Sequence, residues 1–423
     1  MLVGPPSCPA QSEPILLPPQ FERVIVDEAH HIKLRTSLCW KLVDALRSRF
    51  LLLLTATPVE SDIDDIYSLV TLLRPGHFAT AAAFRAQFVD AKDASSVRNR
   101  EQLRALLGQV MVRNTRAGCG LGLPPRFVST ISVLPLPAEQ ALYLAVLAAL
   151  RRHAGQRGSA RLFDVLLLEA GSSPAAVAST LERALGRGDR DAAATAELQE
   201  LLALARAATE SRKRTALLEI AATHPGEQIL VFTRYRSTAA FIAAGLRTAG
   251  IDHVVFEGGL APADRARVLD AFAAGTRVMV ATDVGGEGQN LQHCHVLVDF
   301  DLPWNPMLIE QRIGRLHRMG QQHEVRVYNL AAKGTIDDRL LDVLDRRLHL
   351  FELVVGEMDM VLGNLADERD LEERLLALAA ESGRDEELDA GFAAIEDELR
   401  AARSGYEKSK ALDDALFGEE FET

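Results

Sequence analysis

Two short, continuously apolar runs near the start of the chain predict buried strands. They cover residues 23–27 (Arg-Val-Ile-Val-Asp) and 50–56 (Phe-Leu-Leu-Leu-Leu-Thr-Ala), and such runs are typical of strands covered on both faces of a parallel sheet. Between them, residues 37–47 have helical spacing. Strand, helix and strand in this order predict the crossover unit of an α/β domain. A third extended run, residues 127–136, ends at Pro137 and is expected to close this first region.

The pattern changes after residue 137. Up to about residue 222 the chain is rich in Ala, Leu, Arg and Glu, with Gly, Ser and Pro breaks that predict several helices joined by short loops. Apolar runs then return between helical stretches and predict a second, more complete α/β domain. These runs are residues 228–233, 253–256, 277–283, 295–301 and 325–330. Beyond Thr335 the chain becomes helical and then acidic, and its last dozen residues are expected to be mobile.

The expected fold class is therefore α/β, organised in four segments. Residues 1–137 form a first α/β region, and residues 138–222 form a helical insertion or linker. Residues 223–334 form the second α/β domain, and residues 335–423 form a helical, acidic extension. A chain of 423 residues, 48% of them apolar, is long enough for each domain to bury its own core.

Charge and cysteine usage narrow the class of protein. Residues 364–423 carry 19 acidic and 7 basic residues, while residues 1–363 carry 40 of each, so the net charge of −12 lies in the tail. A neutral body is compatible with a local basic groove for nucleic acid, and an acidic tail is most often a solubilising end.

The four scattered cysteines argue against a zinc site or a disulfide framework. No run approaches the ~20 apolar residues of a membrane span, and the start lacks the pattern of a secretory signal, so a reducing cytoplasm is expected.

Asp27-Glu28 is the first candidate for catalysis. The pair follows an apolar strand, where side chains emerge at the carboxyl edge of a parallel sheet and meet ligand. In nucleotide hydrolysis, Asp27 would hold Mg²⁺ through its water shell and Glu28 would activate the attacking water. The alternative is a pair of solvated carboxylates that open a helix. His30-His31 lacks a third metal ligand at suitable spacing.

Arg312, Arg315 and Arg318 form the second candidate. Their spacing of three predicts one side of a helix that begins near Pro306, with no carboxylate at the positions between them. Such a stripe needs an external polyanion, either the phosphates of a nucleotide or, as a less specific basic face, DNA. Three glycines in residues 285–288 follow a buried strand and allow backbone amides to approach phosphate or ribose. The glycines of residues 118–122 run into Pro124-Pro125 and receive no phosphate role.

Taken together, these segments resemble the helicase motifs of Swi/Snf-type ATPases, over about residues 20–350. Trp304-Asn305-Pro306 and His317 to Gln321 distinguish this family from other DEAH-box proteins, and residues 334–356 resemble bacterial members in particular. The motifs in chain order are Asp27-Glu28-Ala29-His30, Thr55-Ala56-Thr57-Pro58, Ile229 to Thr233, Thr282 to Gly288, Asp301 to Pro306 and Gln311 to Gln321.

The resemblance implies two RecA-like lobes that close on ATP and magnesium and track along double-stranded DNA, in a bacterial, nucleoid-associated protein. It implies that Asp27 and Glu28 are the magnesium and hydrolysis pair and that Arg315 and Arg318 are arginine fingers. The further residues it implies for nucleotide binding are Gly286, Gly288, Gln289, Gln311 and Arg312. Those it implies for nucleic-acid contact and coupling are His30, Thr55, Thr57, Thr233, Thr282 and Trp304.

The sequence departs from this family in one respect. The family's phosphate loop, which ends in Gly-Lys-Ser/Thr, should precede the first strand, and no lysine occurs before Lys33. We therefore expect weak ATP binding and little turnover from this chain alone. The strand at residues 50–54 would also lose a neighbour and become an exposed apolar edge, unless a partner polypeptide supplies the missing half of lobe one.

Two other functions stay open on the sequence. One is a nonenzymatic DNA-binding or scaffold protein with a vestigial nucleotide site, and the DNA upstream of the Met1 codon would discriminate between them. The other is an RNA helicase of the wider superfamily, which Trp304-Asn305-Pro306 disfavours.

Overall fold

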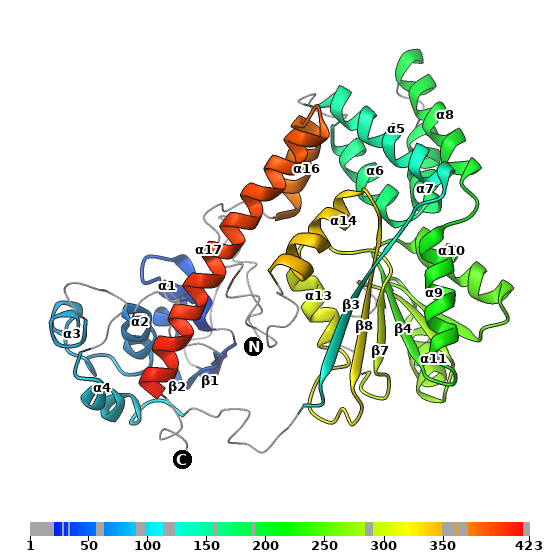
Figure 1. Cartoon of the computed structure of the whole chain (residues 1–423). Helices are drawn as coiled ribbons and strands as arrows, with labels where there is room; N and C mark the ends of the chain where they lie inside the picture. The colour runs from blue at the N-terminus through cyan, green and yellow to red at the C-terminus, as the bar shows by residue number, and fades with distance from the viewer. Residues whose placement is uncertain are drawn as a thin grey trace. The chain divides into compact units, whose positions relative to one another are not determined.

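The computed structural model describes residues 21–27, 29–32, 34–55, 63–89, 98–112, 123–154, 160–187, 191–283, 291–348, 361 and 371–417 (Figure 1). The chain divides into two compact units. The first unit holds residues 1–122, 360–364 and 400–423, and the second holds residues 123–359 and 365–399. No described helix is both long enough and apolar enough to cross a membrane.

The first unit contains a parallel pair of strands joined by a helix, as predicted. β1 (Phe21–Val26) pairs with β2 (Ser48–Leu53) in parallel, with Ile25 opposite Leu52. α1 (Leu38–Ala45) connects them, and the Ser37 side chain caps it by accepting a hydrogen bond from the Trp40 backbone N–H at 3.1 Å. A short 3₁₀ turn, η1 (Ala29–Ile32), follows β1.

Two apolar clusters hold the first unit together. One packs Ala29, Ile32 and Trp40 against α2 (Asp64–Leu73) and the inner face of the strands. The other joins α2 to α3 (Ala81–Phe88) and α4 (Arg100–Leu107) around Phe78 and Phe84. The opposite face of the two strands is exposed at Ile25, Phe50, Leu52 and Leu54. The expectation that both faces are buried is therefore wrong for this sheet.

The second unit is built on a six-stranded parallel sheet in the order β3-β8-β7-β4-β6-β5. The strands are β3 (Arg126–Val133), β4 (Ile229–Thr233), β5 (His253–Phe256), β6 (Val278–Thr282), β7 (Val296–Asp299) and β8 (Val325–Ala332). Every residue of β4, β6 and β7 is buried, as their continuous apolar runs predict. α9 (Arg212–Thr223) and α10 (Arg236–Thr248) pack on this sheet through Leu217, Ile220 and Ile242.

One predicted strand belongs to a different sheet from the one expected. Residues 127–136 were assigned to the first region, but β3 pairs with β8 along its whole length and lies in the second unit. The first unit therefore ends before Leu123 rather than at Pro137. The local pattern predicts a strand but does not identify the strand with which it pairs. That strand, β8, lies about two hundred residues further along the chain.

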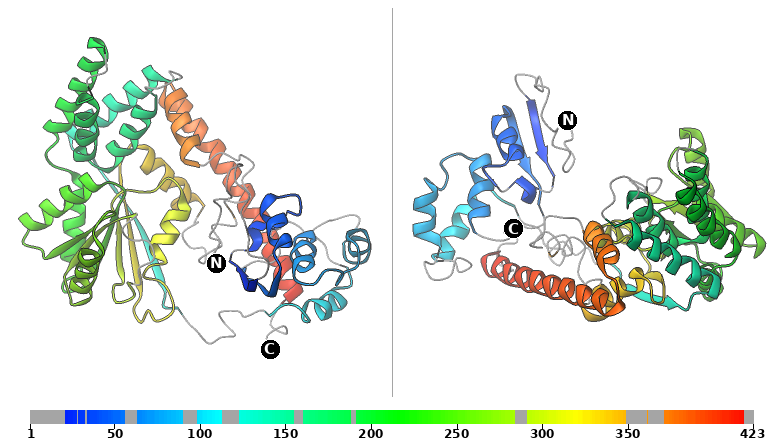
Figure 2. Two further views of the ribbon diagram at one scale, coloured as in Figure 1. Left: turned by 180° about the vertical axis from the view of Figure 1, so that it is seen from behind. Right: turned by 90° about the horizontal axis from the view of Figure 1, so that it is seen from above.

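Helices gather beyond the carboxyl ends of the strands in the second unit (Figure 1). The helical stretch predicted for residues 138–222 is present, as α5 (Pro137–His153), α6 (Ala160–Ser172), α7 (Pro174–Leu185), α8 (Ala192–Ala207) and α9. Further helices among the residues that the structure describes in this unit are α11 (Pro262–Ala273), α13 (Pro306–Ile313), α14 (Ile336–Leu341), the π-helical turn η2 (Asp342–Arg347) and α16 (Leu371–Glu381). α17 (Asp385–Phe417) has residues 385–399 in the second unit and later residues in the first. Seen from behind, α16 lies beside α5 (Figure 2). The last dozen residues, expected to be mobile, lie in α17 as far as Phe417 and beyond it outside the described residues.

Candidate functional site

Asp27 and Thr55 lie at the same edge of the first unit's sheet. β1 and β2 are parallel, with Val26 opposite Leu53, so the residues that follow the two strands emerge next to one another. The Leu54 N–H donates to the Val26 carbonyl at 2.8 Å and the Ala29 N–H donates to the Leu54 carbonyl at 2.8 Å, which extends the pairing past both strand ends. Asp27 is exposed there and Thr55 is half-buried.

Several predicted partners at this edge cannot be placed. Glu28 and Thr57 lie outside the described residues, and of His30 only the backbone is described, within η1. Asp27 itself fits magnesium, a hard cation that takes one or two carboxylates and keeps several waters. Across the described ranges, no three His, Cys, Asp or Glu side chains cluster as a metal site, so these residues form no cage of protein ligands.

In the second unit, three acidic residues at the ends of β6 and β7 surround Arg312. The Arg312 Nε donates to Asp283 Oδ1 at 2.8 Å, and Nη1 donates to Asp299 Oδ1 at 2.5 Å and to the Asp301 carbonyl at 3.1 Å. The guanidinium also lies over the Phe232 ring of β4, 5.2 Å from its centroid. Only 4% of the Arg312 side chain is exposed. Arg312 therefore ties together the ends of strands that lie side by side in the sheet.

This geometry corrects the predicted arginine stripe. α13 ends at Ile313, so Arg315 and Arg318 lie in the turns that follow and do not share a helix face with Arg312. Arg312 is bound to carboxylates of its own unit rather than presented to an external polyanion. Gln311, its neighbour on α13, is exposed, as is Arg318, while Arg315 is half-buried.

The segment that carries Arg315 and Arg318 is held in place by Gln321. The Gln321 Nε2 donates to the carbonyls of Gln292, Cys294 and Leu316 at 3.0, 3.0 and 3.2 Å. Its Oε1 accepts from the His323 backbone N–H at 2.9 Å. The turn after α13 is thus anchored by one buried amide.

Thr233, Thr282 and Trp304, predicted as contact and coupling residues, are all buried. The Thr282 hydroxyl accepts from the Gly258 N–H at 3.2 Å, and the Trp304 Nε1 donates to Asp337 Oδ1 at 2.5 Å. These side chains face the interior of the second unit, and the contact and coupling roles expected of them stay predictions. Gly286, Gly288 and Gln289 lie outside the described residues.

Asp301 is a hub that the sequence analysis did not assign. Its carboxylate accepts hydrogen bonds from the Thr233 hydroxyl, from Ser172 Oγ at 2.7 Å and from the Arg234 N–H at 2.8 Å. Thr233 ends β4 and Ser172 ends α6, so one carboxylate joins the sheet to the helical stretch. Two acidic residues, Asp299 and Asp301, at the end of a short apolar run are the signal that could have found it.

The hub lies where strand order reverses, between β4 and β7. The chain continues from β4 to the β6–β5 side of the sheet and then returns to β7 on the other side. The carboxyl ends of strands at such a point form a crevice that binds ligands in open α/β sheets. In this unit Asp301, Arg312 and the Ser172 hydroxyl of α6 lie at that point and are buried.

Burial and like charge raise the pKa values of the acids around Arg312. Burial raises the pKa of Asp299 to about 6, with Arg312 opposing the rise and Asp283 and Asp301 adding to it. Burial likewise raises the pKa of Asp283, again opposed by Arg312. The Arg312 guanidinium is shared between Asp283 and Asp299, which limits how well it can stabilise both carboxylates in the charged form.

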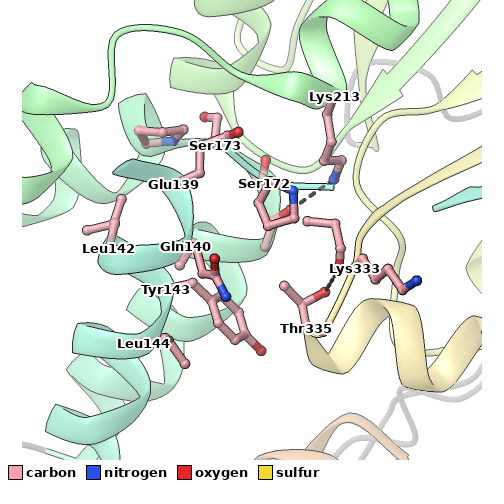
Figure 3. Close-up of a pocket in the computed structure, with 16 residues that line it drawn as sticks. Glu139, Gln140, Leu142, Tyr143, Leu144, Ser172, Ser173, Lys213, Lys333 and Thr335 are labelled. Carbon is pink, nitrogen blue, oxygen red and sulfur yellow. Dashed lines mark hydrogen bonds between the residues drawn. The ribbon is translucent and has the colours of Figure 1, made fainter. Parts of the chain in front are cut away.

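A cavity opens next to this network, between α5, the α6–α7 turn and the turn that follows β8 (Figure 3). Lys213 lines it, and its ammonium donates to the Gly171 carbonyl at 2.9 Å and lies 5.1 Å from the Phe300 ring centroid. Burial lowers the pKa of Lys213, while Asp337 and Asp301 oppose that shift. Figure 3 shows Glu139, Gln140 and Tyr143 on the α5 side and Lys213 with Thr335 on the other. Most of these polar groups are already bonded within the protein, so the cavity extends the network rather than forming a second site.

Comparisons with known proteins cover both units. A family model described as SNF2-related domain matches residues 13–181, and one described as helicase conserved C-terminal domain matches residues 212–320. An uncharacterized ATP-dependent helicase of Bacillus subtilis, YqhH, is 36% identical over 378 residues, which cover 88% of this chain and 67% of that protein. A mouse SWI/SNF-related regulator of chromatin is 24% identical, and the match covers 82% of this chain but only 33% of the relative.

Solved structures of related proteins also match, at low similarity. The Sulfolobus solfataricus SWI2/SNF2 ATPase core in complex with dsDNA is 22% identical, with a TM-score of 0.40, over 81% of this chain and 70% of that one. The helicase domain of Pyrococcus furiosus Hef is 18% identical, with a TM-score of 0.47, over 75% of this chain and 72% of that one. The match to the Bacillus helicase across most of both chains, together with the two domain matches, shows that this chain belongs to the SNF2-related family of ATP-hydrolysing, helicase-like proteins.

Proposed function

We propose that the chain is part of a DNA-dependent ATPase that couples ATP hydrolysis to movement on double-stranded DNA. The observation that carries this proposal is the meeting of Asp27 and Thr55 at the carboxyl edge of two parallel strands. This is where an acidic residue of such a motor has to reach a nucleotide and a hydroxyl has to sense it. Membership of an ATP-hydrolysing family supports the same function.

In this proposal the first unit supplies the hydrolysis chemistry. Bound magnesium would neutralise charge on the nucleotide phosphates, and Asp27 would hold it through its water shell. Glu28 would orient the attacking water, and Thr55 and Thr57 would link that step to DNA contact. His30, next in the same segment, would assist this coupling.

The second unit would contribute positive charge and nucleotide contacts. Arg315 and Arg318 would act as arginine fingers, presented by the turn that Gln321 anchors. Gly286, Gly288, Gln289 and Gln311 would contact the nucleotide. Arg312 would hold the strand ends in register rather than touch phosphate, because its donors are bound to Asp283 and Asp299.

Double-stranded DNA is the proposed polymer partner. Contacts to the phosphate backbone carry no sequence information, which suits a motor that moves along any duplex. The archaeal SWI2/SNF2 core is described in complex with dsDNA, which supports this choice. We place such a protein in the bacterial cytoplasm, at the nucleoid.

The test is ATP turnover by the chain extended through the reading frame upstream of Met1, with and without duplex DNA. We expect DNA to stimulate turnover severalfold, and Glu28→Gln to lower it by about 10²-fold or more, because a catalytic base typically contributes that much. Glu22→Gln, the same chemical change at an exposed position of β1, serves as the control. Unchanged turnover in Glu28→Gln, or no response to DNA, would overturn the proposal.

A nonenzymatic DNA-binding or scaffold role is the second candidate. The observation that favours it is that residues 1–423 contain no Gly-Lys-Ser/Thr sequence to cradle phosphates. We propose that these residues alone turn over ATP weakly. A second polypeptide that supplies a phosphate loop is part of the same proposal. The scaffold role would be favoured if the extended wild-type chain also turned over ATP only at the background rate while still binding DNA.

A further inference from the structure

The acidic helices near the C-terminus are packed onto the second unit. Leu375 and Ala379 of α16 are fully buried, and Phe392 of α17 is 5% exposed. Gly391 lets the two helices approach closely, since a Cβ at that position would lie 2.1 Å from Leu378 Cδ1. Residues 371–399 are therefore a docked helical hairpin rather than only a solubilising end.

Acidic side chains of this hairpin pair with arginines of the rest of the unit. The guanidinium of Arg234 donates two hydrogen bonds to the two carboxylate oxygens of Glu372, at 2.8 and 3.2 Å. Arg339 pairs with Asp389. Arg347 donates to Glu396 at 2.7 Å. These pairs link the acidic tail to arginines of residues 1–363, the part of the chain that is neutral overall.

Arg234 differs from the other two arginines in its position. It directly follows β4, and its backbone N–H donates to Asp301, so it lies at the carboxyl edge where the strand order reverses. Its side chain is 23% exposed and that of Glu372 is 21% exposed, so the pair is half-buried and part of it reaches solvent. A guanidinium binds a carboxylate and a phosphate with the same two-pronged geometry. Glu372 thus occupies the Arg234 guanidinium, whose geometry also suits a phosphate.

We propose that α16 is an acidic cover acting in cis, in which Glu372 competes with the phosphate backbone of duplex DNA for the guanidinium of Arg234. When Glu372 holds Arg234, the second unit has one phosphate contact fewer. When duplex DNA takes Arg234, the end of α16 loses its anchor on β4. This inference rests on the proposed function, because the polyanion is DNA.

The experiment measures the affinity of the extended chain for a 5′-labelled 30-base-pair duplex by fluorescence anisotropy, over a series of salt concentrations. We expect Glu372→Gln to bind about threefold to tenfold more tightly at 100 mM salt, because one more phosphate contact becomes available. Its plot of log affinity against log salt should steepen by about one unit for the same reason. Glu373→Gln is the matched control, with the same loss of charge at the exposed neighbouring position.

The double variant Arg234→Gln/Glu372→Gln should lose the gain. Hydrogen exchange of residues 371–381 checks that α16 stays folded in Glu372→Gln, so that a gain is not caused by unfolding. Equal affinities of Glu372→Gln and Glu373→Gln, or a gain retained in the double variant, would overturn the cover while leaving DNA binding intact. If neither wild type nor any variant binds duplex at 50 mM salt, the proposed function fails and the cover with it.

Discussion

Glu169 is a carboxyl group buried between α6 and α7 of the second unit. It is 3% exposed, and its Oε1 accepts a hydrogen bond from Thr180 Oγ1 at 2.6 Å. Its Oε2 receives no hydrogen bond from any residue that the structure describes. Burial raises the pKa of Glu169 to about 7, while Thr180 and Arg183 oppose the rise. The folded protein therefore keeps this proton at pH values where the unfolded chain has lost it.

The consequence for stability has a definite sign. Because the folded pKa lies above the ordinary value of 4.5, the contribution of Glu169 is fully present below about pH 4.5 and is lost as pH rises through about 7. Glu169→Gln keeps the shape and the Thr180 contact but never ionises. We expect the free energy of unfolding of this variant to equal that of wild type near pH 4.5. At pH 8 we expect it to exceed the wild-type value by about 2–3 kcal/mol.

Urea unfolding at both pH values measures this difference. Glu200→Gln, the same change at an exposed position of α8, is the control and should show no such dependence on pH. A difference between Glu169→Gln and wild type that stays constant from pH 4.5 to 8 would contradict the prediction.

At the scale of elements, the apolar runs predicted strands well but not their surroundings. β4 and β2 read alike in the sequence, yet β4 is buried on both faces and β2 exposes Phe50, Leu52 and Leu54 beside it. The difference arises because β4 lies between β7 and β6 under α9 and α10, while β2 has β1 as its partner in a two-stranded sheet. An apolar run shows that the residues are hydrophobic. Whether they are buried depends on how many strands and helices pack against them.

Gly171, in the last turn of α6, lies against Asp337 of α14. A Cβ at this position would lie 2.7 Å from Asp337 Oδ2, and Asp337 is held by Trp304 Nε1. We expect Gly171→Ala to lower the free energy of unfolding by about 1–3 kcal/mol, because the buried carboxylate would have to shift. Guanidinium unfolding would measure the change.

A matched substitution separates this clash from helix propensity. Gly405 of α17 has no atom within 4 Å of its added Cβ, so Gly405→Ala should be neutral or stabilise by about 0.5–1 kcal/mol. If Gly171→Ala also stabilises the protein, α6 and α14 do not pack as described.

At the scale of the whole molecule, the first unit exposes an apolar surface on its two strands. Ile25, Phe50, Leu52 and Leu54 are each between 42% and 55% exposed. A two-stranded sheet with such an exposed apolar face recruits other strands or copies of the chain. Self-association is therefore the expected behaviour of residues 1–423.

Leu52→Lys would place a charge in the middle of that surface. We expect it to weaken self-association of residues 1–423 by at least about tenfold, since a charge on an exposed strand opposes pairing. Sedimentation velocity over a range of concentrations gives the measurement. Leu144→Lys, at a similarly exposed position of α5, is the control and should behave like wild type. Equal association by all three proteins would show that the strand surface is not responsible.

The sequence by itself determined the α/β class, the runs that form the described strands, the helical stretch after residue 137 and the family, because periodicity and short motifs are local properties. It also placed Asp27 and Thr55 at strand ends, where parallel pairing brings them together. It did not predict α2, α3 and α4 of the first unit. Only the tertiary structure decided that β3 joins β8, that Arg312 faces buried carboxylates, and that Glu372 holds Arg234. Each of these contacts joins groups that lie far apart in the chain. The sequence does not show whether an arginine binds a protein carboxylate or an external phosphate, because its guanidinium binds both with the same geometry.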